Sequence, residues 1–119
     1  ECPLPTSLKS LEITRNECLD REIIYYLPQG LTNLDIDGTE LENSDIKLLP
    51  SSITSIGLES VNKLTNEFFQ FLPLGLKDLK LSECKKIDAK GFQYLPHTLT
   101  FLLLHKLKWM NDENLEYIP

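Results

Sequence analysis

The chain has 119 residues, 41% of them hydrophobic and 25% charged, which allows one core of ordinary composition. Its formal net charge of −6 argues against a nucleic-acid partner, because phosphate binding needs a concentrated basic surface and Lys85-Lys86 is the only local basic cluster. No apolar stretch approaches the ~20 residues that cross a bilayer, so we expect no membrane partner.

The three cysteines, Cys2, Cys18 and Cys84, are odd in number and widely spaced. A disulfide scaffold or a zinc site needs paired, closely spaced thiols. We therefore interpret them as reduced thiols in a reducing compartment. The first residues lack the basic-then-apolar pattern of a signal peptide.

A Leu-Pro dipeptide recurs every 22 or 23 residues and contains most of the chain's prolines. This spacing divides the chain into repeats at 4–26, 27–48, 49–71, 72–94 and 95–117, with a partial sixth from 118. Counted from the leucine of each Leu-Pro, positions five, eight and ten are always Leu or Ile. The alternation at positions eight to ten predicts a short strand with one buried face, at 11–13, 34–36, 56–58, 79–81 and 102–104.

The second half of each repeat predicts a turn and a short helix. Positions thirteen and sixteen are predicted to be interior, and position seventeen to be the helix N-cap, with the second repeat running one residue early. The predicted N-caps are Asp20, Glu42, Thr65, Asp88 and Asn111, four of which are favourable cap residues. Positions twenty-one and twenty-three are predicted to form the buried side, before the next proline ends the helix: Ile24 and Tyr26, Ile46 and Leu48, Phe69 and Phe71, Phe92 and Tyr94, Leu115 and Tyr117.

No single repeat can bury its aliphatic face, so the repeats are expected to stack. The L-x-x-L-x-L core and the period near 23 resemble the leucine-rich-repeat superfamily across residues 1–119. The resemblance implies one domain of the α/β class, a right-handed solenoid with a curved parallel sheet on its concave face and short helices on its convex face. It also implies protein binding on the concave face and no cofactor.

Two subtypes of this superfamily are combined in the sequence. The segment 79–88, with Cys84 at position thirteen, is similar to the cysteine-containing class of F-box-associated substrate receptors, although Asn16 is the only other expected residue in that column. Leu49-Pro50-Ser51-Ser52-Ile53 is similar to the repeats of effectors secreted by pathogenic bacteria. The resemblance therefore implies a bacterial effector that acts on host proteins, inside the cell or in the host cytoplasm. The alternatives are a receptor segment of a ubiquitin-ligase assembly and, against the cysteine pattern, an extracellular adhesion or ligand-sensing repeat.

The partner is expected at positions seven, nine and eleven, which point out of the sheet. The predicted binding residues are Glu12, Asp35, Asp37, Glu59, Asp78, Lys80, Phe101, Leu103 and His105. The acidic members either steer a basic protein surface or serve only as soluble surface residues. Phe101 and Leu103 are either an interface anchor or are covered by a neighbouring segment, and Trp109 is expected in the core.

Catalysis is not expected, because the chain contains none of the common catalytic or phosphate-binding motifs. His97 and His105 are interpreted as surface residues, and Cys84 as a packed interior thiol. Asp35 and Asp37 share one strand face and could imitate an acid–base pair, but no cleft is predicted around them. Neither end carries a polar cap, so we expect either a fragment of a longer array or two copies that cover each other's ends.

Overall fold

The computed structural model describes residues 4–14, 21–38 and 41–105. Along the chain, five strands alternate with short helices. The order is β1 (Ser10–Ile13), 3₁₀ helix η1 (Arg21–Tyr26), β2 (Asn33–Asp37), α1 (Asn43–Ile46), β3 (Ser55–Glu59), 3₁₀ helix η2 (Asn66–Phe71), β4 (Asp78–Ser82), 3₁₀ helix η3 (Ala89–Tyr94) and β5 (Phe101–His105).

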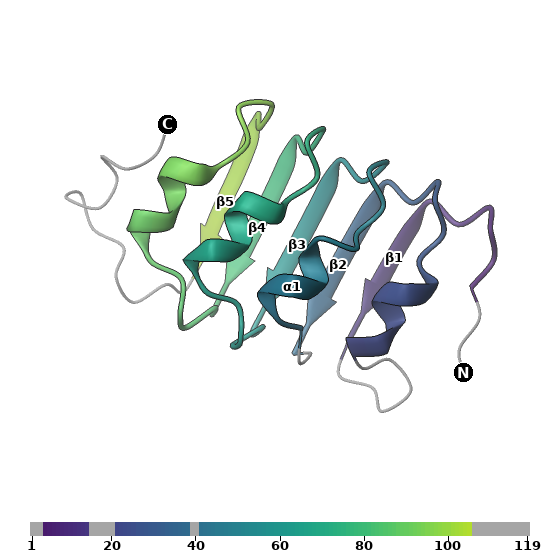
Figure 1. Cartoon of the computed structure of the whole chain (residues 1–119), viewed down its shortest axis with the longest axis horizontal. Coiled ribbons are helices and arrows are strands. Elements are labelled where there is room, and N and C mark those ends of the chain that lie inside the picture. The colour runs from purple at the N-terminus through teal and green to yellow at the C-terminus, as the bar shows by residue number, and fades with distance from the viewer. Residues whose placement is uncertain (1–3, 15–20, 39–40, 106–119) are drawn as a thin grey trace.

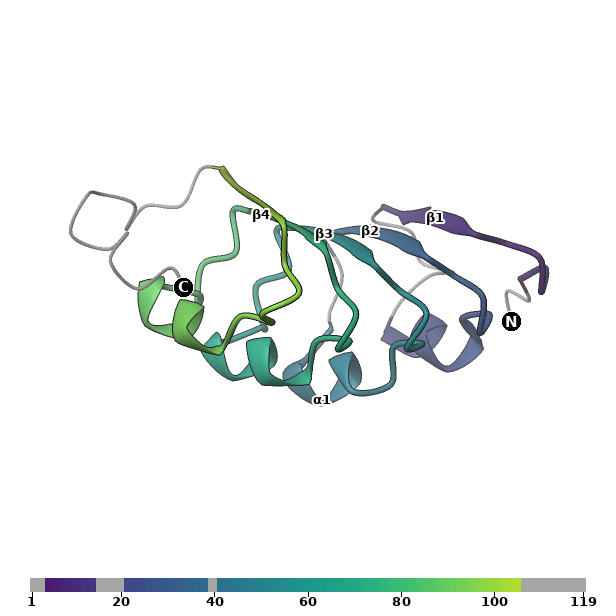
Figure 2. The same ribbon diagram turned by 90° about the horizontal axis from the view of Figure 1, so that it is seen from above.

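The five strands form one parallel sheet in the order β1-β2-β3-β4-β5 (Figure 1). Figure 2 shows the helices in a second layer on one face of this sheet. The register pairs equivalent positions of successive repeats, as in Leu34 with Ile56 and Ile56 with Leu79. The expectation of an α/β fold with a parallel sheet is therefore confirmed. None of the described helices is long and apolar enough to span a bilayer.

The core consists of the columns that the repeat predicts. In the second to fourth repeats, positions five, eight and ten are all buried: Leu31, Leu34, Ile36, Ile53, Ile56, Leu58, Leu76, Leu79 and Leu81. The interior columns at positions thirteen and sixteen are also buried wherever the structure describes them: Leu41, Val61, Leu64, Cys84 and Ile87. In the first and last repeats, Leu8, Leu11, Leu99, Leu102 and Leu104 are only partly buried, because each packs against a neighbour on one side.

The prolines of the described Leu-Pro dipeptides begin tight turns, and from Pro28 onward each also follows a helix. The proline carbonyl oxygen accepts a hydrogen bond from the amide three residues on, for example Leu31 N–H to Pro28 O at 3.2 Å and Leu76 N–H to Pro73 O at 3.1 Å. The same bond occurs at Pro5, Pro50 and Pro96. The turn delivers the position-five leucine into the core just before the strand begins.

The prediction that position twenty-three is buried is wrong. Tyr26, Leu48 and Tyr94 are 52%, 47% and 46% exposed, and Phe71 is only partly buried. Two residues that are two positions apart on a helix lie roughly 200–240° apart around its axis, so positions twenty-one and twenty-three cannot both face the core. Leu115 and Tyr117 lie outside the described residues.

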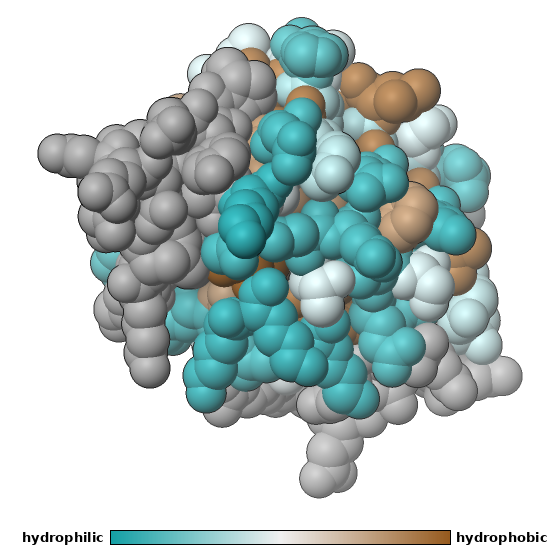
Figure 3. Space-filling view, turned by 60° about the vertical axis from the view of Figure 1, so that its left-hand side comes forward, coloured by the Kyte–Doolittle hydropathy of each residue, from teal (hydrophilic) through white to brown (hydrophobic). Residues whose placement is uncertain are grey.

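Positions twenty and twenty-one fill the helix layer instead. Phe68 and Phe69 are buried, with ring centroids 4.4 Å apart, and Phe69 meets the ring of Phe92 edge-on at 5.8 Å. Asp45 is buried at position twenty of the second repeat. In the view of Figure 3, the visible hydrophobic residues form separate patches within a largely hydrophilic surface.

The predicted helix caps are partly correct. The Asp88 carboxylate accepts a bond from the Lys90 amide at 2.9 Å, as an N-cap should. At α1, the Glu42 amide donates to the Asp45 carboxylate at 2.9 Å, which is the return bond of a capping box. Thr65 is the N-cap residue of η2 as predicted, but its hydroxyl makes no bond to its own helix. Asp20 and Asn111 lie outside the described residues.

Thr65 instead takes part in an asparagine ladder between repeats. The Asn43 side-chain amide donates to the Thr65 hydroxyl at 2.7 Å, and the Thr65 amide donates to Asn43 Oδ1 at 3.0 Å. One repeat later, the Asn66 amide donates to Asp88 at 2.8 Å and its Oδ1 accepts from the Asp88 amide at 3.0 Å. The ladder satisfies main-chain donors at helix starts with side chains from the preceding repeat.

Replacing Asn66 with alanine should destabilise the chain by about 1–3 kcal/mol, because the partly buried Asp88 amide loses its acceptor. Chemical denaturation should show a lower midpoint. Asn62 is an exposed asparagine in the same region and makes no side-chain hydrogen bond within the described part of the chain, so Asn62→Ala is the matched control and should change stability little. Equal losses in the two variants would contradict the ladder.

The residue that directly follows each of β2, β3 and β4 has a left-handed backbone. Gly38, Ser60 and Glu83 have φ values of 70°, 57° and 55° at the same repeat position. Each amide donates to a carbonyl of the following repeat, as from Ser60 to Ser82 at 2.9 Å. Only Gly38 is a residue type that favours this conformation, so the contacts to the next repeat stabilise it at Ser60 and Glu83.

Candidate functional site

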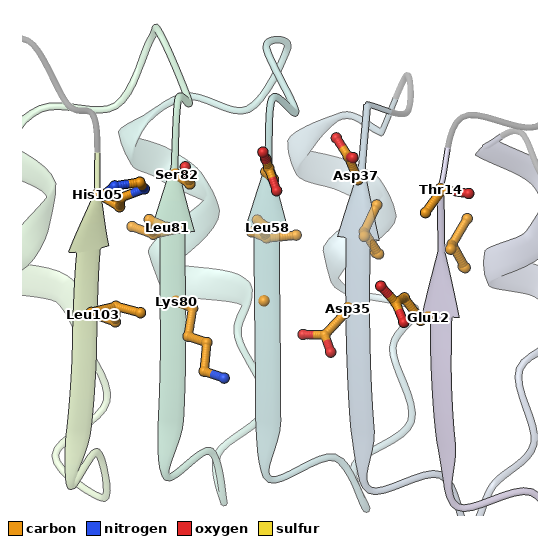
Figure 4. Close-up of a pocket in the computed structure, with 14 residues that line it drawn as sticks. Glu12, Thr14, Asp35, Asp37, Leu58, Lys80, Leu81, Ser82, Leu103 and His105 are labelled. Atoms are coloured by element: carbon orange, nitrogen blue, oxygen red, sulfur yellow. The ribbon is translucent and has the colours of Figure 1, made fainter.

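The sheet face opposite the helices, called the open face below, contains the side chains at positions seven, nine and eleven. It contains a groove of about 590 Å³. Figure 4 shows the charged and apolar side chains that line it from all five strands. Seven of the predicted binding residues line the groove: Glu12, Asp35, Asp37, Glu59, Lys80, Leu103 and His105. Asp78 and Phe101 are paired in register at the start of β4 and β5 and lie outside it.

The parallel register arranges the groove residues in rows across the strands. The position-nine row is Glu12, Asp35, Gly57, Lys80 and Leu103, and the position-eleven row includes Asp37, Glu59, Ser82 and His105. Neighbouring strands are ~4.8 Å apart, so Glu12 stands next to Asp35, and Asp37 next to Glu59. Directly adjacent like charges destabilise a sheet by about 0.2–1 kcal/mol per pair.

These four carboxylates have no cationic partner within 4 Å and accept no hydrogen bond in the part of the chain that the structure describes. Among the residues that the structure describes, Lys80 is the only lysine or arginine that lines the groove, and it stands on β4, beyond Gly57.

Gly57 is a site residue that the sequence prediction missed. A Cβ atom at this position would overlap Oδ1 of Asp35, which shows that the Asp35 carboxylate lies directly over the glycine backbone. Figure 4 shows Asp35 leaning towards β3 from one side and Lys80 leaning towards it from the other. Gly57 is buried beneath them although it belongs to an outward-facing column. It is the only glycine in the outward columns, and that signal could have identified it.

The β5 end of the open face is apolar. Phe101 and Leu103 are 47% and 46% exposed, side by side on one strand face. Leu103 lines the groove, and Phe101 lines a smaller pocket of about 210 Å³ with Pro96 and Leu99. Trp109, expected in the core, lies outside the described residues. His97 and His105 are both exposed.

The position-eleven row contains Glu59, Ser82 and His105, residue types that also form hydrolytic triads. A triad needs the histidine between the serine and the carboxylate. Here Ser82 stands between the other two, so Glu59 and His105 are two strand spacings, or ~10 Å, apart. No hydrogen bond joins Ser82 to His105 among the described residues. The row therefore does not assemble a nucleophile and an oriented base.

Cys84 lies beneath this region and is 1% exposed, as the sequence predicts for an interior thiol. Its Sγ lies 3.6 Å from the Ser82 carbonyl oxygen and 3.9 Å from that of Leu58. Burial raises the pKa of the Cys84 thiol from its usual value of 9.0, because the thiolate would lose its hydration. The native thiol is therefore protonated and unreactive.

Cys84 should make the chain less stable in alkali. Its pKa is higher folded than unfolded, so the unfolded chain releases a proton first, and stability falls as pH rises above about 9. The slope approaches ~1.4 kcal/mol per pH unit until the folded pKa is reached. Denaturation curves from about pH 8 to about pH 11 should show this loss in the wild type and a smaller one in Cys84→Ala. Parallel pH profiles would contradict the assignment.

In the described residues, no three His, Cys, Asp or Glu side chains are grouped so as to hold a metal ion. The site is a groove on a broad sheet face, with acidic side chains towards β1 and apolar side chains towards β5. No family model, curated protein or solved structure matches the chain.

Proposed function

We propose that the chain is a right-handed leucine-rich-repeat solenoid that recognises a protein partner through its open face and does not itself catalyse a reaction. The repeated sequence unit, the in-register parallel sheet and the single helix layer support this architecture. In such a stack, the sheet face is the one broad surface to which every repeat contributes side chains. A partner that lies across it contacts all the repeats at once.

The observation that supports recognition most strongly is the combination, on one open face, of exposed apolar side chains and of carboxylates that have no cationic partner within 4 Å among the described residues. Exposed acidic residues raise the encounter rate with a basic surface. Exposed aromatic and aliphatic side chains supply the contacts that hold the complex. Together they describe the two parts of a protein interface, a charged region for approach and an apolar anchor.

The Leu-Pro-x-x-Leu phase favours a bacterial effector that acts on host proteins, located in the host cytoplasm. The position-thirteen Cys84, buried as in cysteine-containing repeats, favours the second candidate, a receptor segment of a ubiquitin-ligase assembly. An extracellular adhesion repeat is the third, and the odd number and wide spacing of the cysteines argue against it. An F-box-like or ligase domain encoded beside this segment in the full-length gene would distinguish the first two.

Reversing the charge at Glu12, Asp35 and Asp37 to lysine should weaken capture of a partner from host-cell lysate. At low salt we expect at least tenfold less bound partner, because three attractive charges become repulsive. The difference should shrink as salt rises to about 0.5 M, where charges are screened within ~5 Å. Glu67→Lys, an exposed charge reversal in η2 on the helix side, is the control and should leave capture unchanged. Equal capture by the triple variant and the wild type would remove the open face as the binding surface.

A further inference from the structure

We propose that the open face binds a basic protein segment that crosses the strands in a defined orientation, with its cationic side chains over β1 to β3 and an apolar side chain against β5. This rests on the proposed function and adds the chemistry and polarity of the partner. The acidic end is defined as Glu12, Asp35, Asp37 and Glu59, and the apolar end as Phe101 and Leu103.

The acidic end is built to accept cations. Its carboxylates form two adjacent pairs, one in each row, and none has a cation within 4 Å among the described residues. Because Gly57 has no side chain, the Asp35 carboxylate leans over β3 towards the middle of the sheet. A lysine or arginine side chain placed between either pair removes a repulsion and gains two attractions.

Lys80 fixes the orientation. It projects from β4 towards β3, between the two ends of the groove. A partner cation placed over β4 or β5, or over Gly57 on β3 where the Lys80 side chain leans, would be repelled by Lys80. An apolar side chain placed over the carboxylates of β1 to β3 would desolvate them without compensation. Only one arrangement avoids both costs, with cations towards β1 and the apolar residue towards β5.

The strand spacing sets the spacing within the partner. Asp35 on β2 and Leu103 on β5 stand in the same row, three strand intervals or ~14 Å apart. An extended segment rises ~3.3 Å per residue, so its cationic and apolar residues should be about four positions apart. An extended segment is the simplest occupant, because alternate side chains point towards one face.

Binding of blocked synthetic peptides of about nine residues, measured by calorimetry at about 50 mM salt, tests this. The matching peptide carries two lysines at alternate positions and a leucine about four positions beyond the second lysine, so that all three side chains of an extended segment point towards the sheet. A second peptide of identical composition places the leucine beside the lysines, and a third replaces the lysines with glutamines. We expect the matching peptide to bind about tenfold more tightly than either.

Residue pairing is tested with Asp35→Asn and Leu103→Ala. Each should weaken binding of the matching peptide about fivefold to tenfold. Asp35→Asn should reduce the difference between the lysine and glutamine peptides. Leu103→Ala should reduce the difference between the matching peptide and a fourth peptide that carries alanine in place of the leucine. Glu67→Gln and Leu74→Ala are the matched controls, since Glu67 is exposed on η2 and Leu74 is 90% exposed. If Asp35→Asn changed the response to the peptide leucine and Leu103→Ala changed the response to the lysines, the proposed orientation would be overturned.

The outcomes separate this inference from the proposed function. Equal binding of the first two peptides, with sensitivity to both open-face variants, would overturn the spacing while leaving protein recognition intact. Binding that neither open-face variant weakens, or no binding of any peptide together with unchanged lysate capture by the charge-reversed chain, would contradict both. Concentration-dependent sedimentation of the chain alone that Asp35→Asn abolishes would identify a second copy as the occupant and overturn the proposal.

Discussion

Replacing Phe69 with alanine is expected to cost about 3–5 kcal/mol of folding free energy, the largest loss from any single substitution considered. Phe69 is 2% exposed and contacts Phe68 in its own helix and Phe92 in the next repeat. Alanine removes the ring from both contacts and leaves a cavity between two helices that neighbouring side chains cannot fill without moving. Because domains of this size are stable by only ~5–15 kcal/mol, this loss is a large part of the total.

Thermal and chemical denaturation should both report the Phe69→Ala loss. Phe69→Leu, which retains most of the volume, should lose much less. Tyr94→Ala is the matched control, since Tyr94 is 46% exposed and its ring contributes little buried area. If the two alanine variants lost the same stability, the aromatic contact between repeats would not be a main source of cohesion.

Replacing Gly91 with alanine should be the second largest effect, about 1–3 kcal/mol of destabilisation from one methyl group. A Cβ at Gly91 would lie 2.6 Å from both Asn66 Oδ1 and Phe69 Cε2, so the ring and the ladder asparagine would have to move. In an unobstructed helix the same change would stabilise by up to ~1 kcal/mol, which makes the expected sign informative.

Gly75→Ala is the matched control for Gly91→Ala, because a Cβ at Gly75 meets nothing within 4 Å. It should leave the denaturation midpoint nearly unchanged. Combining Gly91→Ala with Phe69→Leu should lose less than the sum of the two, since the smaller side chain relieves the crowding. A neutral Gly91→Ala would show that η3 does not press against the preceding repeat.

The columns of the sequence repeat predicted the fold well because the aliphatic columns have the same buried environment in every central repeat. The leucine positions that precede and form the strands are buried in every central repeat, and Cys84 is an interior thiol as expected. The outward-facing residues were predictable to the same extent, since outward strand positions follow directly from alternation. The prediction that no cleft surrounds Asp35 and Asp37 is wrong, because both line the groove. Whether these residues bind the partner remains a prediction.

Other features were not predictable because they depend on contacts between repeats. The exposure of Tyr26 and Tyr94 depends on the rotation of short 3₁₀ helices, which hydrophobicity alone does not specify. The Asn43 and Asn66 ladder occurs in two repeats, too few to appear as a column. The left-handed backbone at Ser60 and Glu83 carries no residue signal, because tertiary hydrogen bonds stabilise it.

The matching registers between successive strands make one repeat an interchangeable module. In the described chain, the main contacts between strands and between helices join adjacent repeats, so excising residues 49–71 would bring β2 against β4 with equivalent positions aligned. Asn43 would then face Asp88, a partner that already accepts an amide from Asn66. Ile46 would replace Phe69 opposite Gly91 and leave a gap there. Length could therefore change by whole modules, in evolution or by engineering, with stability lost mainly where the aromatic ring is missing.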